Sequence, residues 1–62
     1  MSADRILVVD DHAGFRATAR RLLERDGWSV VEADDGAAAL LAVAALDPDV
    51  VLLDIGLPDA SG

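Results

Sequence analysis

The stretch that decides the fold is residues 5–12, which read Arg-Ile-Leu-Val-Val-Asp-Asp-His. Four consecutive apolar residues, three of them β-branched, are followed at once by two acids. A short run of this kind predicts a strand that is buried on both faces, as in a parallel sheet. We therefore expect a strand over residues 5–10 and a helix that opens at Asp11 or His12.

Outward from this strand, the chain alternates helices and strands. Apolar residues at helical spacing predict a first helix that ends at Gly27; they are Phe15, Ala19, Leu22 and Leu23. Residues 28–33 are a second strand, whose mixed polarity suits the edge of a sheet. Residues 37–46 form an apolar, uncharged helix, which should be covered on more than one side. Residues 50–53 are a third, apolar strand.

This βαβαβ order predicts an α/β fold with parallel strands and right-handed crossovers. The first and third strands are the most apolar and should be interior, which the strand order 2-1-3 satisfies. The strand order then switches between them, and open α/β sheets bind ligands at such a switch, at the carboxyl ends of the strands. Asp10 and Asp11 follow the first strand and Asp54 follows the third. We therefore expect these three acids to meet in one crevice.

Three converging carboxylates repel one another unless a cation offsets their charge. Oxygen ligands at a crevice open to water favour Mg²⁺. A carboxylate beside Mg²⁺ can attack a phosphoryl group to form an acyl phosphate, and Asp54 is the better nucleophile because it stands alone on its strand. Taken singly, each acid is better explained as a helix cap or a turn residue. Because the strand order brings all three acids into one crevice, a shared cation and phosphoryl site is the better explanation for the three together.

Other features are interpreted as structural. His12 has no partner histidine or cysteine, so it is a helix-start residue rather than a metal ligand. The arginines of the first helix form a solvated face, paired through Glu24 to Arg20 and Arg21. Trp28 is a partly buried residue at the sheet edge.

Composition narrows the class of protein. The net charge of −7 argues against direct contact with nucleic acid, whose phosphates need a positive surface. A hydrophobic content of 53% is too high for a disordered segment. There is no cysteine, which rules out disulfides and thiolate metal sites. No apolar run approaches the roughly 20 residues of a membrane span, so we expect a soluble, cytoplasmic protein without a membrane partner.

Two segments resemble the receiver domains of bacterial response regulators. The first is residues 6–12, with its acidic pair, and the second is residues 53–62, where Asp54 is followed by Pro58 and then by Gly62. The resemblance covers the whole chain and implies a flavodoxin-like, doubly wound parallel sheet. Residues 1–62 would form a partial receiver domain, with the first three strands and two helices, and the C-terminal half absent.

The resemblance also implies a chemistry. Asp54 would be the phosphoacceptor, supplied by a sensor histidine kinase or a small phosphodonor, so the chain is at most a self-phosphorylating protein rather than an enzyme. Asp11, Asp54 and the backbone carbonyl of Gly56 would bind Mg²⁺ directly, and Asp10 would act through a water molecule.

The same resemblance suggests the kind of output domain, and it shows which receiver residues this chain lacks. Asp-Asp-His followed by Phe15 and Arg16 is similar to receivers that drive helix-turn-helix DNA-binding output domains. The chain has no lysine, so the lysine that pairs with the phosphoryl group is missing, as is the hydroxyl residue that ends the fourth strand. We predict that the chain alone cannot complete the phosphorylation switch.

The third strand should also be an exposed apolar edge. Such a chain should dimerise, swap segments, aggregate or stay partly unfolded. Two functions stay open: a piece of a full receiver, or a stand-alone interaction module that pairs its open edge with itself or with a receiver. A phosphotransfer enzyme of the dehalogenase type would need an Asp-x-Asp motif after the first strand, which Asp10-Asp11 does not provide.

Overall fold

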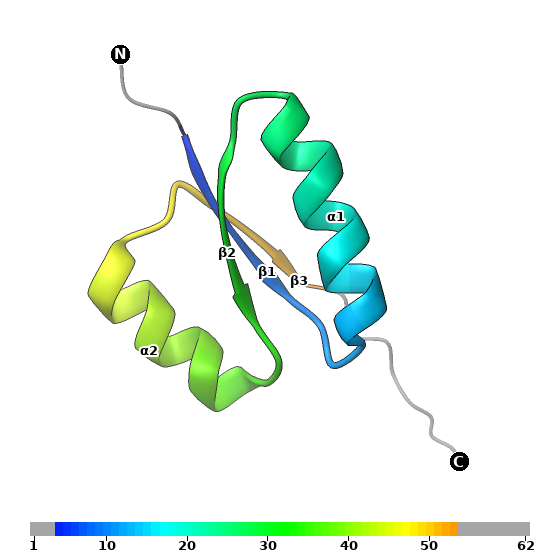
Figure 1. Ribbon diagram of the computed structural model, residues 1–62. Helices are drawn as coiled ribbons and strands as arrows, with labels where there is room; N and C mark the ends of the chain where they lie inside the picture. Colours follow the sequence, from blue (N-terminus) through cyan, green and yellow to red (C-terminus); the bar gives the residue numbers. More distant parts are fainter. Residues whose placement is uncertain (1–3, 54–62) are drawn as a thin grey trace.

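The computed structural model describes residues 4–53, which form a three-stranded parallel sheet and two helices (Figure 1). The elements are β1 (Arg5–Val9), α1 (Ala13–Arg25), β2 (Ser29–Ala33), α2 (Gly36–Leu46) and β3 (Val50–Leu53). The strand order is β2-β1-β3. The predicted α/β class, the parallel sheet and the order 2-1-3 are confirmed, and so is the edge position of β2.

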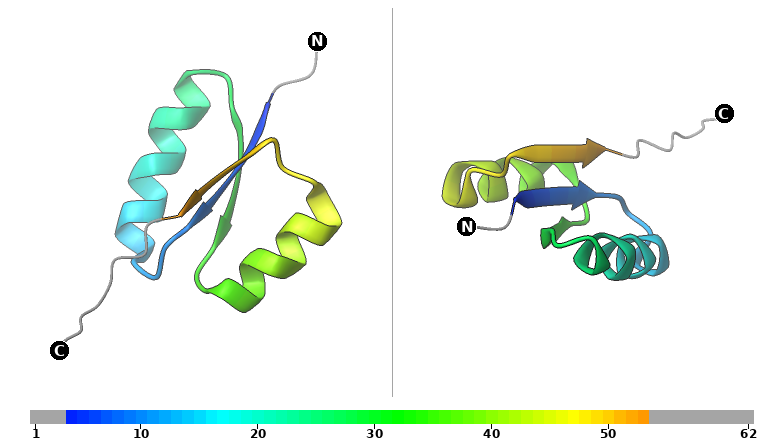
Figure 2. Two further views of the ribbon diagram at one scale, coloured as in Figure 1. Left: turned by 180° about the vertical axis from the view of Figure 1, so that it is seen from behind. Right: turned by 90° about the horizontal axis from the view of Figure 1, so that it is seen from above.

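The core lies on both faces of β1, because successive side chains of a strand point to opposite faces. Leu7 and Val9 pack with Ala39 of α2, and Ile6 and Val8 pack beside Leu23 of α1. The two helices therefore cover opposite faces of the sheet, as Figure 2 shows from two further directions. Burial on both faces is what the unbroken apolar run of β1 predicted.

The cover over α2 is thinner than predicted. Only Ala39 of this helix is buried, and Leu40 and Leu41 are both 73% exposed. Within residues 4–53 the helix therefore rests on the sheet along one side, and the expected cover on its other sides is not met. The packed side is made of alanines, whose small side chains let the helix approach the sheet while its leucines face outward.

The third strand also differs from the expectation of an interior strand. In the described sheet β3 lies at an edge, and all four of its residues are exposed. Its outer side has no neighbouring strand among residues 4–53. The exposed apolar edge that the sequence predicted is therefore confirmed.

Contacts at the start of the strands set their register. The backbone N–H of Arg5 donates to Asp49 Oδ2 at 2.8 Å, and the N–H of Asp49 donates to the Arg5 carbonyl at 2.8 Å. The Arg5 guanidinium also donates to the Leu46 carbonyl. With this end fixed, Val9 pairs with Leu53 at the opposite end, so β1 and β3 finish side by side.

Candidate functional site

The acidic pair lies where β1 ends, but its two side chains have opposite surroundings. The strand stops at Val9, one residue earlier than predicted, although the N–H of Asp10 still donates to the Ala33 carbonyl at 3.1 Å. The Asp10 side chain is only 3% exposed, whereas that of Asp11 is 82% exposed. One acid is therefore part of the packed sheet end and the other faces solvent.

Asp10 also organises the turn that follows it. Its Oδ1 atom accepts a hydrogen bond from the N–H of His12, two residues on, at 2.7 Å. Aspartate commonly bonds to its own backbone in this way, which is the turn-forming role considered above as the alternative for a single acid. The turn formed by Asp10 is compatible with a place in the site, because this turn leaves the side chain of Asp11 exposed.

His12 begins α1, as predicted, but its ring also enters the acidic site. It is the N-cap residue, with an extended backbone and no capping hydrogen bond from its side chain. Its Nδ1 atom lies 3.1 Å from Asp10 Oδ1 and 2.9 Å from Asp11 Oδ1. This contact was not predicted from the sequence, because His12 was weighed against a second histidine or cysteine and not against the carboxylates beside it; the signal was the run Asp10-Asp11-His12 itself.

The two carboxylates of this cluster suit a hard cation. Asp10, Asp11 and His12 each offer one ligand atom, and these atoms lie within 4.8 Å of one another. Carboxylate oxygens are the ligands that Mg²⁺ prefers, and an exposed carboxylate can bind a metal that keeps much of its water shell. Asp11 is thus suited to direct binding, and the buried Asp10 to contact through a water molecule.

Two of the predicted site residues, Asp54 and Gly56, lie outside the described residues. The structure brings Asp10 and Asp11 together at one edge of the sheet and places Leu53, the residue before Asp54, opposite Val9. The meeting of Asp54 with the acidic pair stays a prediction.

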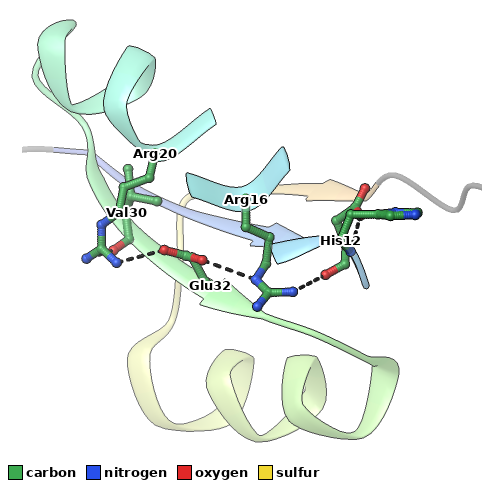
Figure 3. Close-up of polar contacts among 6 residues, drawn as sticks. His12, Arg16, Arg20, Val30 and Glu32 are labelled. Carbon is green, nitrogen blue, oxygen red and sulfur yellow. Dashed lines mark hydrogen bonds and ion pairs between the residues drawn. The ribbon is translucent and has the colours of Figure 1, made fainter. Parts of the chain in front are cut away.

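A second polar cluster links α1 to the site, and most of it was not predicted (Figure 3). Glu32 of β2 accepts hydrogen bonds from Arg16 Nε at 3.1 Å and from Arg20 Nη1 at 2.8 Å. Arg16 Nη1 also donates to the Asp10 carbonyl at 2.6 Å. The arginines of α1 are therefore not simply a solvated face. The available signal was Glu32 itself, an acid inside a strand, because such a group needs a partner.

The part of the cluster that faces water follows the prediction more closely. Arg20 Nε donates to Glu24 Oε2 at 3.1 Å, which confirms that pair. No ion pair of Arg21 is found among residues 4–53. The hydrogen bonds to Glu24 and then to Glu32 raise the pKa of Arg20 above its ordinary value. Trp28 is partly buried against the α1-facing core, as expected.

Within residues 4–53, neither helix has the length and apolar character to cross a membrane.

Known proteins with a similar sequence identify the family. The family model described as the response regulator receiver domain matches residues 6–62. The chain is 48% identical over 59 residues to a putative transcriptional regulator of Pseudomonas aeruginosa, covering 94% of this chain and 28% of that protein. It is 47% identical over 57 residues to the transcriptional regulatory protein KdpE of Mycobacterium tuberculosis, covering 92% and 25%.

A third relative is named as a sensor kinase rather than as a transcriptional regulator. The CAI-1 autoinducer sensor kinase/phosphatase CqsS of Vibrio cholerae is 43% identical over 58 residues, which cover 94% of this chain and 8% of that protein. The chain thus spans about a quarter of the two transcriptional regulators and less of the kinase. Together with the βαβαβ sheet and the acidic pair at its edge, the family match shows that the chain belongs to the response regulator receiver domains of two-component signalling.

Proposed function

We propose that this chain is the phosphoacceptor part of a response regulator, in which Asp54 takes a phosphoryl group from a sensor histidine kinase. The observation that carries the proposal is the placement of Asp10 and Asp11 at the end of β1, with Leu53 paired to Val9 on the neighbouring strand. The match to the receiver-domain family supports the uptake of a phosphoryl group at this edge of the sheet.

The proposed roles of the residues follow from the resemblance to receiver domains. Asp11, Asp54 and the Gly56 carbonyl would hold Mg²⁺ and Asp10 would contribute through a water molecule; the metal would supply positive charge to offset the negative charge of the incoming donor. The Asp54 carboxylate forms a new O–P bond while the N–P bond of the donor histidine breaks, and the bonding electrons stay on the imidazole. In the absence of a kinase, the chain at most phosphorylates itself from a small phosphodonor.

The proposal extends to the rest of the parent protein. Residues 1–62 serve as the first half of a receiver domain, whose missing lysine and hydroxyl residue are supplied by further sequence. The relatives' names as transcriptional regulators support a DNA-binding output domain in the parent protein, and a place of action in the cytoplasm. The chain alone is not expected to switch, because the groups that would sense the phosphoryl group are not in it.

Uptake of a phosphoryl group should require Mg²⁺. We expect native mass spectrometry to show one added phosphoryl group per chain after incubation with acetyl phosphate and Mg²⁺. Removing the metal with EDTA should slow this uptake at least about tenfold, because a metal ion typically supplies several kcal/mol of charge stabilisation. Uptake at the same rate with and without chelator would contradict the metal-assisted mechanism.

A second candidate function is self-association through the exposed edge of β3. The favouring observation is that this strand and the helix α2 both expose large apolar side chains, namely Leu40, Leu41, Val50, Val51, Leu52 and Leu53. An open apolar edge is a template for pairing with another chain, and a lysine placed there blocks such pairing.

If this module dimerises through β3, sedimentation velocity should show a monomer–dimer equilibrium. Leu52→Lys should weaken it at least about tenfold, because a charge on the edge must be desolvated when the strands pair. Leu22→Lys makes the same change on exposed α1 and should leave the equilibrium unchanged. A monomer at every concentration, or equal effects of both variants, would reject this function.

A further inference from the structure

We propose that Arg16 is a positioning residue for the acidic loop, residues 10–12, and that it thereby sets the affinity of the site for Mg²⁺. This inference rests on the proposed function, and it concerns a residue that contacts neither the metal nor the phosphoryl group in that proposal.

Arg16 contacts the residues on both sides of Asp11, and the contact made by its guanidinium is drawn in Figure 3. Its guanidinium Nη1 donates to the carbonyl of Asp10 at 2.6 Å. Its backbone N–H donates to the carbonyl of His12 at 3.1 Å. One residue in the first turn of α1 therefore contacts the carbonyls of both residues that flank the exposed acid.

The guanidinium is itself held in place. The Arg16 side chain is only 17% exposed, and its Nε atom donates to Glu32 Oε1 at 3.1 Å. The other oxygen of Glu32 accepts from Arg20 Nη1 at 2.8 Å. Both oxygens of the Glu32 carboxylate accept hydrogen bonds, so this side chain is held in one position on β2. Because the guanidinium is planar and rigid, its bond to Glu32 also fixes where Arg16 meets the Asp10 carbonyl.

Such support matters most for a residue like Asp11. Its side chain is largely in solvent, so surrounding packing does little to fix it, and its place depends on the backbone of the acidic loop. Mg²⁺ demands near-ideal octahedral geometry with short oxygen distances. Groups that orient a metal ligand from outside the metal shell typically change the affinity for metal ten- to a hundredfold.

The test compares Arg16→Gln with Arg20→Gln. Both variants remove one positive charge and one ion pair to Glu32, but only Arg16 contacts the acidic loop. Dissociation constants for Mg²⁺ are measured by NMR titration of the Asp11 and His12 amides. Trp28 fluorescence reports the fold independently, because Trp28 packs against the α1-facing core.

We expect Arg16→Gln to weaken Mg²⁺ binding about ten- to a hundredfold and Arg20→Gln to change it less than about threefold, with the Trp28 signal unchanged. The sign is informative, since removing a positive charge near acids should by charge alone strengthen the binding of a cation. Affinity that is equal or tighter in Arg16→Gln, or weakened equally in both variants, would overturn the inference.

A second variant covers the case in which Arg16→Gln loses the Trp28 signal. Glu32→Gln keeps the shape of the anchor while removing its charge, and it should weaken Mg²⁺ binding by a smaller factor than Arg16→Gln. Wild-type affinity in folded Glu32→Gln would then overturn the inference. If the wild-type chain binds Mg²⁺ and takes up phosphoryl groups while these variants match it, only the inference fails. If the wild-type chain does neither, the proposed function fails with it.

Discussion

Replacing Asp54 by asparagine is expected to abolish phosphoryl uptake by this chain. The carboxylate of Asp54 is the proposed nucleophile, and an amide neither attacks phosphorus nor carries the charge that helps to bind Mg²⁺. We expect uptake to fall at least about a hundredfold, an increase of about 2.7 kcal/mol or more in the barrier for phosphoryl transfer. The measurement is native mass spectrometry after incubation with Mg²⁺ and acetyl phosphate.

The matched control for this variant is Asp26→Asn. Asp26 is an exposed acid at the C-cap of α1, and its replacement makes the same chemical change away from the acidic loop. It should take up the phosphoryl group at the wild-type rate. If Asp54→Asn still gains one phosphoryl mass, the acceptor is another residue, and the assignment of Asp54 is wrong.

Much of the fold could be predicted because its signals are local. The apolar run of β1 indicates burial on both faces, and the mixed polarity of β2 indicates an edge. Alternation of strands and helices then limits the topology to parallel pairing with crossovers. The ends of elements were harder to place: Asp10 leaves the strand because its side chain bonds to the His12 N–H and turns the chain.

The site was predicted only in part because its remaining contacts join distant elements. Arg16 and Glu32 are sixteen residues apart and belong to a helix and a strand. Their meeting depends on how α1 crosses the face of the sheet, which the helical period alone does not specify. Arg20 and Glu24, one helical turn apart, were predicted for the opposite reason, since that spacing puts two side chains together in any helix.

A truncation in the centre of the sheet should have the largest effect on folding. Leu7 is fully buried on the middle strand, and it packs beneath α2 in the cluster with Val9 and Ala39. Leu7→Ala removes apolar contacts and leaves a cavity, which in protein cores costs about 2–5 kcal/mol. Chains of this size rarely derive more than about 3–5 kcal/mol from a single core.

We therefore expect Leu7→Ala to be mostly unfolded at 25 °C, with its circular dichroism and Trp28 fluorescence already at their denatured values before urea is added. Leu40→Ala deletes the same atoms from a side chain that is 73% exposed, and it should change the free energy of unfolding by less than about 0.5 kcal/mol. Both variants are compared at one protein concentration, so that self-association affects them equally. If the two truncations cost the same, then the centre of β1 is not the core of this chain. A large loss in Leu40→Ala alone would mean that the outer side of α2 is the side buried in solution.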